Sequence, residues 1–197
     1  MPEIEYVEDR MESEELLERL CPPVRNWFKD KFPDFTEPQK VAIPRILNGE
    51  HLLLCSPTGS GKTLTAFLTI IDDLVRRSLD GSLPDAVQCV YISPIKALAN
   101  DIEKNLMGPL GEIKERYLPS RAKEIKVGLR TGDTPQSERE KMLRKPPHIL
   151  ITTPESLGLG LASKRFRPIL DQMKWFIIDE MHSLVPTKRG THLSLSM

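Results

Sequence analysis

The stretch "LLLCSPTGSGKT" at residues 52–63 joins an apolar run to a glycine-rich turn. This arrangement is typical of a buried strand followed by a phosphate-binding loop. Gly59 and Gly61 allow the backbone to turn its amides inward around phosphate oxygens. Lys62 supplies a cation for the β and γ oxygens, and the Thr63 hydroxyl supplies a ligand for Mg²⁺.

Ser56 stands where the general form of this loop has a glycine, so the sequence raises the question of whether the loop still binds a nucleotide. A long amphipathic pattern follows from Lys62 to about Arg77. The loop therefore lies between a strand and a helix, which is the context that the motif requires.

Short apolar runs rich in Val, Ile and Leu alternate with helical patterns from residue 51 onward. They predict five strands, at residues 51–55, 87–92, 125–130, 148–152 and 175–179. Strands without polar alternation are buried on both faces, which indicates an α/β fold with a parallel sheet and crossover helices. Residues 12–48 read as helical, with breaks at Pro22-Pro23 and near Pro33-Asp34.

The composition is that of a soluble globular domain, with 39% apolar and 28% charged residues in a chain of 197. The 28 basic and 28 acidic residues cancel, so no bulk field attracts nucleic acid or an anionic membrane. The N-terminus is acidic and no apolar run approaches the roughly 18 residues of a membrane span, so we expect a cytoplasmic protein. The spacing of Cys21, Cys55 and Cys89 suits neither a disulfide framework nor a zinc site, and core packing is expected for each.

Three strands end in a Ser or Thr followed by proline, at Ser93-Pro94, Thr134-Pro135 and Thr153-Pro154. Ser and Thr cap helix starts and proline suits the first helical position, so each pair predicts the start of a crossover helix. The carboxyl ends of parallel strands share one edge, where helix N-termini of roughly half a positive charge each could bind phosphates. Such starts are also common in helices that bind nothing.

The segment "WFIIDEMH" places Asp179 and Glu180 directly after a buried strand. In a nucleotide hydrolase one carboxylate near this position holds Mg²⁺ and another orients the attacking water. We therefore predict that Asp179 holds the metal and that Glu180 polarises the water. An activated water also argues against a small-molecule kinase, which places an acceptor hydroxyl there instead.

With these residues assembled, the chain resembles the first motor domain of a superfamily 2 DExH-box helicase, and most closely the large helicase-related (Lhr-like) group. The matching motifs are "SPTGSGKT", "SPIKALANDI", "TGDT", "TPESL" and "DEMH", in that order. In this superfamily the first loop glycine is commonly Ala or Ser, which accounts for Ser56. The resemblance implies a RecA-like parallel sheet with flanking helices, with a lead-in at residues 1–20 and an ATP-binding domain at 21–197.

The resemblance also implies the residues of an ATP site. Gln39 in "TEPQ" would read the adenine edge through a bidentate contact, with Phe32 or Phe35 nearby, although core packing accounts for either ring equally well. His182 would couple the ATP site to the nucleic-acid side; the alternative is a helix-start histidine with a local partner. The ATP-binding set is Gln39, Thr58, Gly59, Ser60, Gly61, Lys62, Thr63, Asp179 and Glu180; Lys62, Asp179 and Glu180 are its catalytic members, and Thr63 and Asp179 its Mg²⁺ ligands.

For nucleic acid, the family implies contacts between the phosphate backbone and three turns at the carboxyl edge of the sheet. Such contacts carry little sequence information, so we expect sequence-tolerant binding of single-stranded or tailed DNA, or of RNA. Lys96, Arg130 and Lys188-Arg189 are candidates for added charge, with solvated surface as the alternative. The predicted contact residues are Ser93, Pro94, Thr131, Gly132, Thr134, Thr153 and Pro154.

The chain ends at Met197, before a Ser-Ala-Thr motif and before a second motor domain. In the family, the strand leading to that motif lies between the loop strand and the 175–179 strand. We therefore expect a domain whose last strands are missing, and a longer protein whose second motor domain supplies an arginine finger. Losing that finger costs about a thousandfold or more in turnover, so these 197 residues alone should hydrolyse ATP slowly and unwind nothing.

The motifs are compatible with three functions. The first is an ATP-dependent helicase or translocase, and the second is an ATP-driven clamp that remodels or anneals nucleic acid without unwinding it. The third is a phosphate-loop ATPase unrelated to nucleic acid, which Gln39 and the "SPIKAL" motif disfavour.

Overall fold

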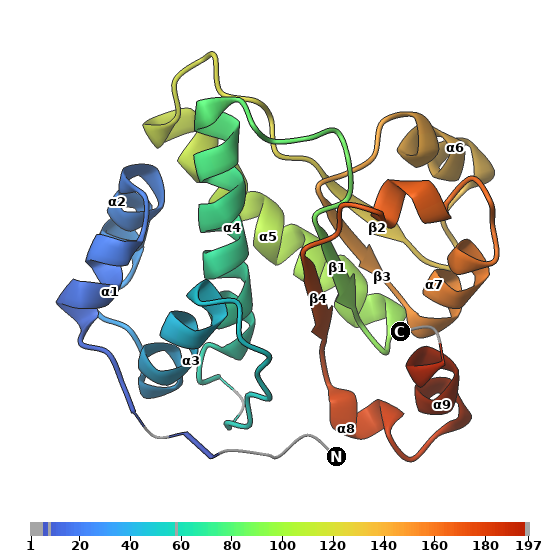
Figure 1. The fold of residues 1–197 in the computed structure, drawn as a ribbon, viewed down its shortest axis with the longest axis horizontal. Helices are drawn as coiled ribbons and strands as arrows, with labels where there is room; N and C mark the ends of the chain where they lie inside the picture. Colours follow the sequence, from blue (N-terminus) through green and yellow to red (C-terminus); the bar gives the residue numbers. More distant parts are fainter. Residues whose placement is uncertain (1–5, 8, 58, 196–197) are drawn as a thin grey trace. The chain divides into compact units, whose positions relative to one another are not determined.

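The computed structural model describes residues 6–7, 9–57 and 59–195, with only the backbone described at 96–98, 100 and 104. Contacts within the chain divide it into two compact units (Figure 1). The first unit contains Met1–Gly81 and Glu112–Ala122, and the second contains Ser82–Gly111 and Lys123–Met197.

The first unit is helical, as residues 12–48 predict. Its helices are α1 (Ser13–Arg19), α2 (Pro22–Lys31), α3 (Glu37–Leu47) and α4 (Lys62–Asp80). The helix predicted after the loop is confirmed and extends to Asp80, and Gly81, with a left-handed φ of 80°, ends it. Its core includes the side chains of Leu16, Val24, Ile43, Leu68 and Leu74, and α3 packs on α4 (Figure 1).

The prediction of a strand at residues 51–55 is wrong. These residues form neither strand nor helix, and Leu53 is 70% exposed. A strand is held by backbone pairing with a neighbour, and no described strand pairs with this segment. The apolar run alone therefore does not create a strand here. Cys55 is also exposed, which corrects its expected core position, whereas Cys21 and Cys89 are buried.

The second unit contains the sheet, and the other four predicted strands are confirmed. They are β1 (Cys89–Ile92), β2 (Val127–Arg130), β3 (Ile149–Thr152) and β4 (Trp175–Ile178). All pairs are parallel and the order is β2-β3-β1-β4. The predicted α/β class with a parallel sheet is therefore confirmed.

Helices connect and cover these strands. They are α5 (Lys96–Tyr117), α6 (Gln136–Arg144), α7 (Pro154–Leu161), the 3₁₀ helix η1 (Arg167–Leu170), α8 (Met181–Leu184) and α9 (Lys188–Ser194). One buried cluster joins the sheet to α7, η1, α8 and α9; it includes Val90, Leu150, Leu157, Ile169 and Leu193. Within the described residues, no helix combines the length and apolarity that a bilayer crossing requires.

The three predicted helix starts differ in detail. Thr153 caps α7 as expected, because its hydroxyl accepts from the amide of Ser156 and Pro154 is the first helical residue. Helices also start at the other two strand ends, as predicted, but α5 begins two residues after Pro94 and α6 one residue after Pro135, so neither proline is the first helical residue. The Ser93 hydroxyl donates to the Ile95 carbonyl at 3.0 Å instead of capping the helix.

Candidate functional site

The phosphate loop and the start of α3 are tied together in the first unit. The Thr36 hydroxyl donates to the Ser60 carbonyl at 2.9 Å, and the Thr36 amide donates to Gln39 Oε1 at 2.9 Å. Gln39 is only 2% exposed, and a Cβ added at Gly61 would lie 2.8 Å from its Nε2. The predicted adenine-reading residue therefore lies against the loop, with its oxygen already shared with the helix cap.

The loop itself has the backbone geometry that inward-facing amides need. Gly59 and Gly61 adopt left-handed φ values of 80° and 86°, which are easily accessible only to glycine. The hydroxyls of Ser56 and Ser60 lie 2.6 Å apart, so the serine at the unusual position forms a hydrogen bond across the loop. Thr58 lies outside the described residues.

Lys62 is held by the loop that it would serve. Its Nζ donates to the carbonyls of Ser56 and Pro57, the latter at 2.8 Å. To reach a phosphate, the ammonium would exchange these neutral acceptors for charged oxygens, which form stronger hydrogen bonds. Thr63 is the second residue of α4, at the positive end of the helix dipole.

The two aromatic candidates for the adenine differ in burial. Phe35 is 4% exposed and stacks on Phe28 with ring centroids 4.1 Å apart, so core packing accounts for it. Phe32 is half-buried, and its ring centroid lies 5.8 Å from that of Trp27 and 5.0 Å from that of Phe28. Phe32 is therefore the more accessible of the two rings.

In the second unit, four predicted site residues follow one row of paired residues. Thr152 of β3 pairs with both Ile92 of β1 and Arg130 of β2, and Ile92 also pairs with Ile178 of β4. The next residue on each strand is therefore at the same edge of the sheet. The predicted meeting of these strand ends is confirmed, and its members are Ser93, Thr131, Thr153 and Asp179.

Both oxygens of the Asp179 carboxylate are hydrogen-bonded. Oδ2 accepts from the Tyr91 hydroxyl at 2.5 Å, and Oδ1 accepts from the Glu180 amide at 2.9 Å. Tyr91 is a buried β1 residue, and burial, reinforced by this hydrogen bond, raises its pKa. It therefore stays a neutral donor that fixes the orientation of the carboxylate. This contact joins two residues that are 88 positions apart in the sequence, and it was not predicted.

Glu180 adopts a left-handed backbone conformation with φ 49° and ψ 42°. No other non-glycine residue in the described part of the chain has a positive φ. Such a conformation costs about 1–2 kcal/mol for a residue with a Cβ. Its Oε2 lies 3.3 Å from Nδ1 of His182, which is 81% exposed. The local partner of the histidine is therefore the proposed water-activating carboxylate itself.

The hydroxyls of the three turns at this edge are engaged within their own turns. Thr134 Oγ1 accepts from the Thr131 amide at 2.8 Å and donates to the Leu129 carbonyl. Thr153 and Ser93 are buried with local partners. Gly132, by contrast, is exposed at the tip of its turn. Backbone amides of the second turn are engaged as well, since those of Thr131, Asp133 and Thr134 donate within the turn.

Mg²⁺ prefers oxygen ligands, and the Thr63 hydroxyl and Asp179 carboxylate are of that kind. Thr63 belongs to the first unit and Asp179 to the second. The described part of the chain holds no group of three or more His, Cys, Asp or Glu side chains that could bind a metal. By donor chemistry alone, the Thr63 hydroxyl and the Asp179 carboxylate fit Mg²⁺.

A family model for the DEAD/DEAH box helicases matches residues 36–197. The chain belongs to this family. The match includes the phosphate loop, all four strands and the Asp179-Glu180 pair. The predicted membership of the helicase superfamily is therefore confirmed, together with the RecA-like fold.

The similar helicases include Lhr proteins from archaea and bacteria. The chain is 48% identical over its whole length to ATP-dependent helicase Lhr-Core of Methanocaldococcus jannaschii and covers 24% of that protein. It is 44% identical over 90% of its length to the Lhr helicase/uracil glycosylase of Escherichia coli, covering 12%. The chain thus spans about a quarter or less of these relatives.

Solved helicase structures agree with the fold. The structure of Mycobacterium smegmatis helicase Lhr bound to ssDNA and AMP-PNP matches 92% of this chain and 23% of that chain, with a TM-score of 0.82 and 45% identity. The DEAD-box helicase Mss116 bound to ssRNA and UDP-BeF matches 98% of this chain and 38% of that chain. Its TM-score is 0.77 and its identity 22%, so this second likeness supports the fold alone.

Two arginines of this helicase domain contact neighbouring parts of the protein, one a turn and the other a core ring. Arg139 on α6 donates to the carbonyls of Thr131, Gly132 and Thr134 at 2.8–3.0 Å. Arg130, a candidate for phosphate charge, lies 4.1 Å above the ring of Phe166. Arg139 was not among the predicted site residues, although a cation one turn into a helix is well placed to bind carbonyls of the preceding turn.

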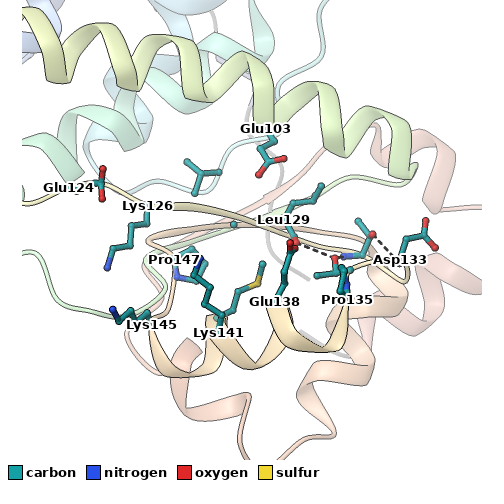
Figure 2. Close-up of a pocket in the computed structure, with 15 residues that line it drawn as sticks. Glu103, Glu124, Lys126, Leu129, Asp133, Pro135, Glu138, Lys141, Lys145 and Pro147 are labelled. Atoms are coloured by element: carbon teal, nitrogen blue, oxygen red, sulfur yellow. Dashed lines mark hydrogen bonds between the residues drawn. The ribbon is translucent and has the colours of Figure 1, made fainter.

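A hollow of about 680 Å³ lies between α5, the edge strand β2 and α6 (Figure 2). Thr131, Asp133 and Thr134 form one end of its lining, where their turn meets α6. Burial raises the pKa of Glu103, with Glu138 a second cause. The lining carries charges of both signs, so it lacks the single-sign field of a phosphate groove. Its charged members are Glu103, Glu124, Lys126, Asp133, Glu138, Lys141 and Lys145.

Proposed function

We propose that this domain is an ATP-dependent nucleic-acid motor that acts in the cytoplasm as part of a helicase or translocase. The observation that carries the proposal is the row of four strand ends, where three phosphate-contact turns lie at the same sheet edge as Asp179. The division into a lead-in at 1–20 and an ATP-binding domain at 21–197 belongs to this proposal.

ATP is the proposed substrate of the phosphate loop. Lys62 leaves the carbonyls of its own loop and binds the β and γ oxygens, while the amides that Gly59 and Gly61 turn inward bind the β-phosphate. Gln39 contacts the adenine through its amide, with Oε1 shared between the base and Thr36. An oxygen with two lone pairs can accept both hydrogen bonds.

The carboxylates supply the hydrolytic chemistry. Asp179, oriented by Tyr91, and the Thr63 hydroxyl would each be a ligand of Mg²⁺. A bound ion would supply positive charge that neutralises the phosphate oxygens. Glu180 accepts a hydrogen bond from the attacking water, and His182 links Glu180 to the nucleic-acid side.

Single-stranded DNA, or RNA, is the proposed partner of the sheet edge. The turns at Ser93-Pro94, Thr131–Thr134 and Thr153-Pro154 bind phosphates through backbone amides and hydroxyls. The cancelling net charge supports this view, because local geometry rather than a bulk field must attract the polyanion. The complex of the similar Lhr helicase with ssDNA and AMP-PNP is consistent with both ligands.

The test is the ATPase rate of the complete protein with and without single-stranded DNA or RNA. We expect stimulation by single strands of any sequence. A rate that single strands leave unchanged would favour an ATPase unrelated to nucleic acid. Strand displacement on a tailed duplex separates a helicase, which displaces the strand, from an ATP-driven clamp, which hydrolyses ATP without displacement.

A further inference from the structure

We infer that Arg189 is a positioning residue that holds two of the phosphate-contact turns at a fixed spacing. The two turns are Ser93-Pro94 after β1 and Thr153-Pro154 at the start of α7. This inference rests on the proposed function, because it assigns Arg189 a role in that nucleic-acid site. It differs from the expectation that Arg189 adds charge for phosphate or is simply solvated.

One guanidinium group contacts both turns. Arg189 Nη2 donates to the Pro94 carbonyl at 2.6 Å and to Glu155 Oε2 at 3.2 Å, and Nε donates to Glu155 Oε1. Glu155 is the second residue of α7, two positions after Thr153. Three elements are thus joined at one planar side chain: the end of β1, the start of α7 and the start of α9.

Close packing fixes the helix that carries Arg189. A Cβ added at Gly158 of α7 would lie 2.1 Å from the His192 ring of α9, so the two helices approach directly over this glycine (Figure 1). A Cβ at Gly190 would lie 2.3 Å from the Leu184 carbonyl. The backbone next to Arg189 is therefore confined, and the guanidinium itself is held by its hydrogen bonds to Glu155 and Pro94.

The pKa shifts of Arg189 and Glu155 agree with an ion pair between them. The hydrogen bond from Arg189 is the main cause that lowers the pKa of Glu155, and the same hydrogen bond raises the pKa of Arg189. Their side chains are 41% and 52% exposed, so the pair contributes little to overall stability. Its consequence is geometric, because the planar guanidinium holds its acceptors in a fixed arrangement, whereas the donors of a lysine ammonium rotate on a flexible stem.

Two other roles make different predictions. If Arg189 contacted a phosphate itself, its removal would lower the slope of log affinity against log salt by about 0.7 for a single strand. If it only neutralised Glu155, which lies beside a proposed phosphate contact, removing both charges together would restore binding. A positioning residue predicts neither result.

The experiment measures single-stranded DNA binding by the complete protein across a salt series. Arg189→Ala should weaken binding about tenfold, which is roughly the effect of losing one charge-assisted hydrogen bond. The salt slope should not change. Arg189→Lys should bind about as weakly as Arg189→Ala. The double variant Arg189→Ala with Glu155→Gln should also stay weak. Arg165→Ala, which changes an exposed arginine after α7, is the matched control and should bind like the unchanged protein.

Each other result overturns the inference. Full binding by Arg189→Lys or by the double variant would reduce the role of Arg189 to charge, and a lower salt slope would make it a phosphate contact. The unchanged protein is measured first, so a failure to bind single strands would refute the proposed function before any variant is compared. Thermal unfolding of each variant identifies a general folding defect, which Arg189→Lys is the least able to cause.

Discussion

The phosphate loop and the carboxyl edge of the sheet are built by contacts of very different range. In the loop, Lys62 binds carbonyls five and six residues away, and Ser56 pairs with Ser60 four residues away. At the sheet edge, the Tyr91–Asp179 and Arg189–Pro94 contacts join residues 88 and 95 positions apart. Apart from its contacts with Thr36 and Gln39, the loop is therefore held by local contacts, whereas the edge depends on the completed fold.

This difference predicts how each region responds to substitution. A local loop retains its shape when one neutral contact is lost, because its backbone geometry rests on glycines. An edge held by distant side chains loses orientation when one of them is changed, even if no ligand-contacting residue is touched. The following substitutions separate chemistry from these two kinds of support.

The largest effect is expected from Glu180→Gln, which should reduce ATP turnover about 10²- to 10⁴-fold while ATP binding is retained. Glutamine keeps the shape of the side chain but is a poor acceptor for a proton from water. Steady-state ATPase and nucleotide titration of the complete protein measure the two quantities. Glu18→Gln on α1, an exposed position, is the control. Normal hydrolysis by Glu180→Gln would show that the water-activating role is wrong.

Lys62→Ala should weaken ATP binding about ten- to a hundredfold, because charge-assisted contacts to the β and γ oxygens are lost. Its partners in the loop are carbonyls that face solvent after the change, so the loop should keep its fold. Titration with a fluorescent ATP analogue measures the effect, with exposed Lys29→Ala on α2 as the control. Affinity within twofold of the unchanged protein would contradict the assignment.

Tyr91→Phe tests the long-range support of the sheet edge. It retains the ring and removes the donor to Asp179 Oδ2, a hydrogen bond worth roughly 1 kcal/mol. We expect about three- to tenfold slower turnover and a higher Mg²⁺ concentration at half-maximal rate, with ATP affinity little changed. Tyr6→Phe at an exposed position is the control. An unchanged Mg²⁺ dependence would mean that the carboxylate needs no such orientation.

The smallest effect is expected from Ser56→Ala, which removes the hydroxyl pair across the loop. The lost neutral hydrogen bond corresponds to less than about threefold in ATP affinity. The same nucleotide titration measures it. A loss as large as that of Lys62→Ala would show that the loop depends on this serine, and the contrast between the two regions would then fail.

Local chemistry explains which parts were predictable from the sequence. The helices up to Leu47, helix α4 and four strands follow from proline breaks, periodicity and apolar runs. The row of strand ends followed from the rule that parallel strands share an edge. The failed strand at 51–55 shows the limit, because an apolar run needs a pairing neighbour that the run itself does not specify.

Within the candidate site, the residue types were predicted and their supports were not. "SGKT" and "DE" specify chemistry within a few residues, whereas Tyr91 gives no sign in the sequence of its distant partner Asp179. The contacts of Arg189 with Pro94 and Glu155 were not predicted for the same reason, since these acceptors are near it only after folding. Long-range contacts of this kind need the register of the sheet before they can be identified.

The left-handed conformation of Glu180 places opposite selection pressures on one position. A library screened only for folding should enrich glycine or asparagine at 180, because both tolerate this backbone better than glutamate. A library screened for ATP turnover should return glutamate and almost nothing else. The two enrichment profiles should agree at neighbouring Ile178 and diverge at 180, which turns a single backbone angle into a measurable trade-off between stability and activity.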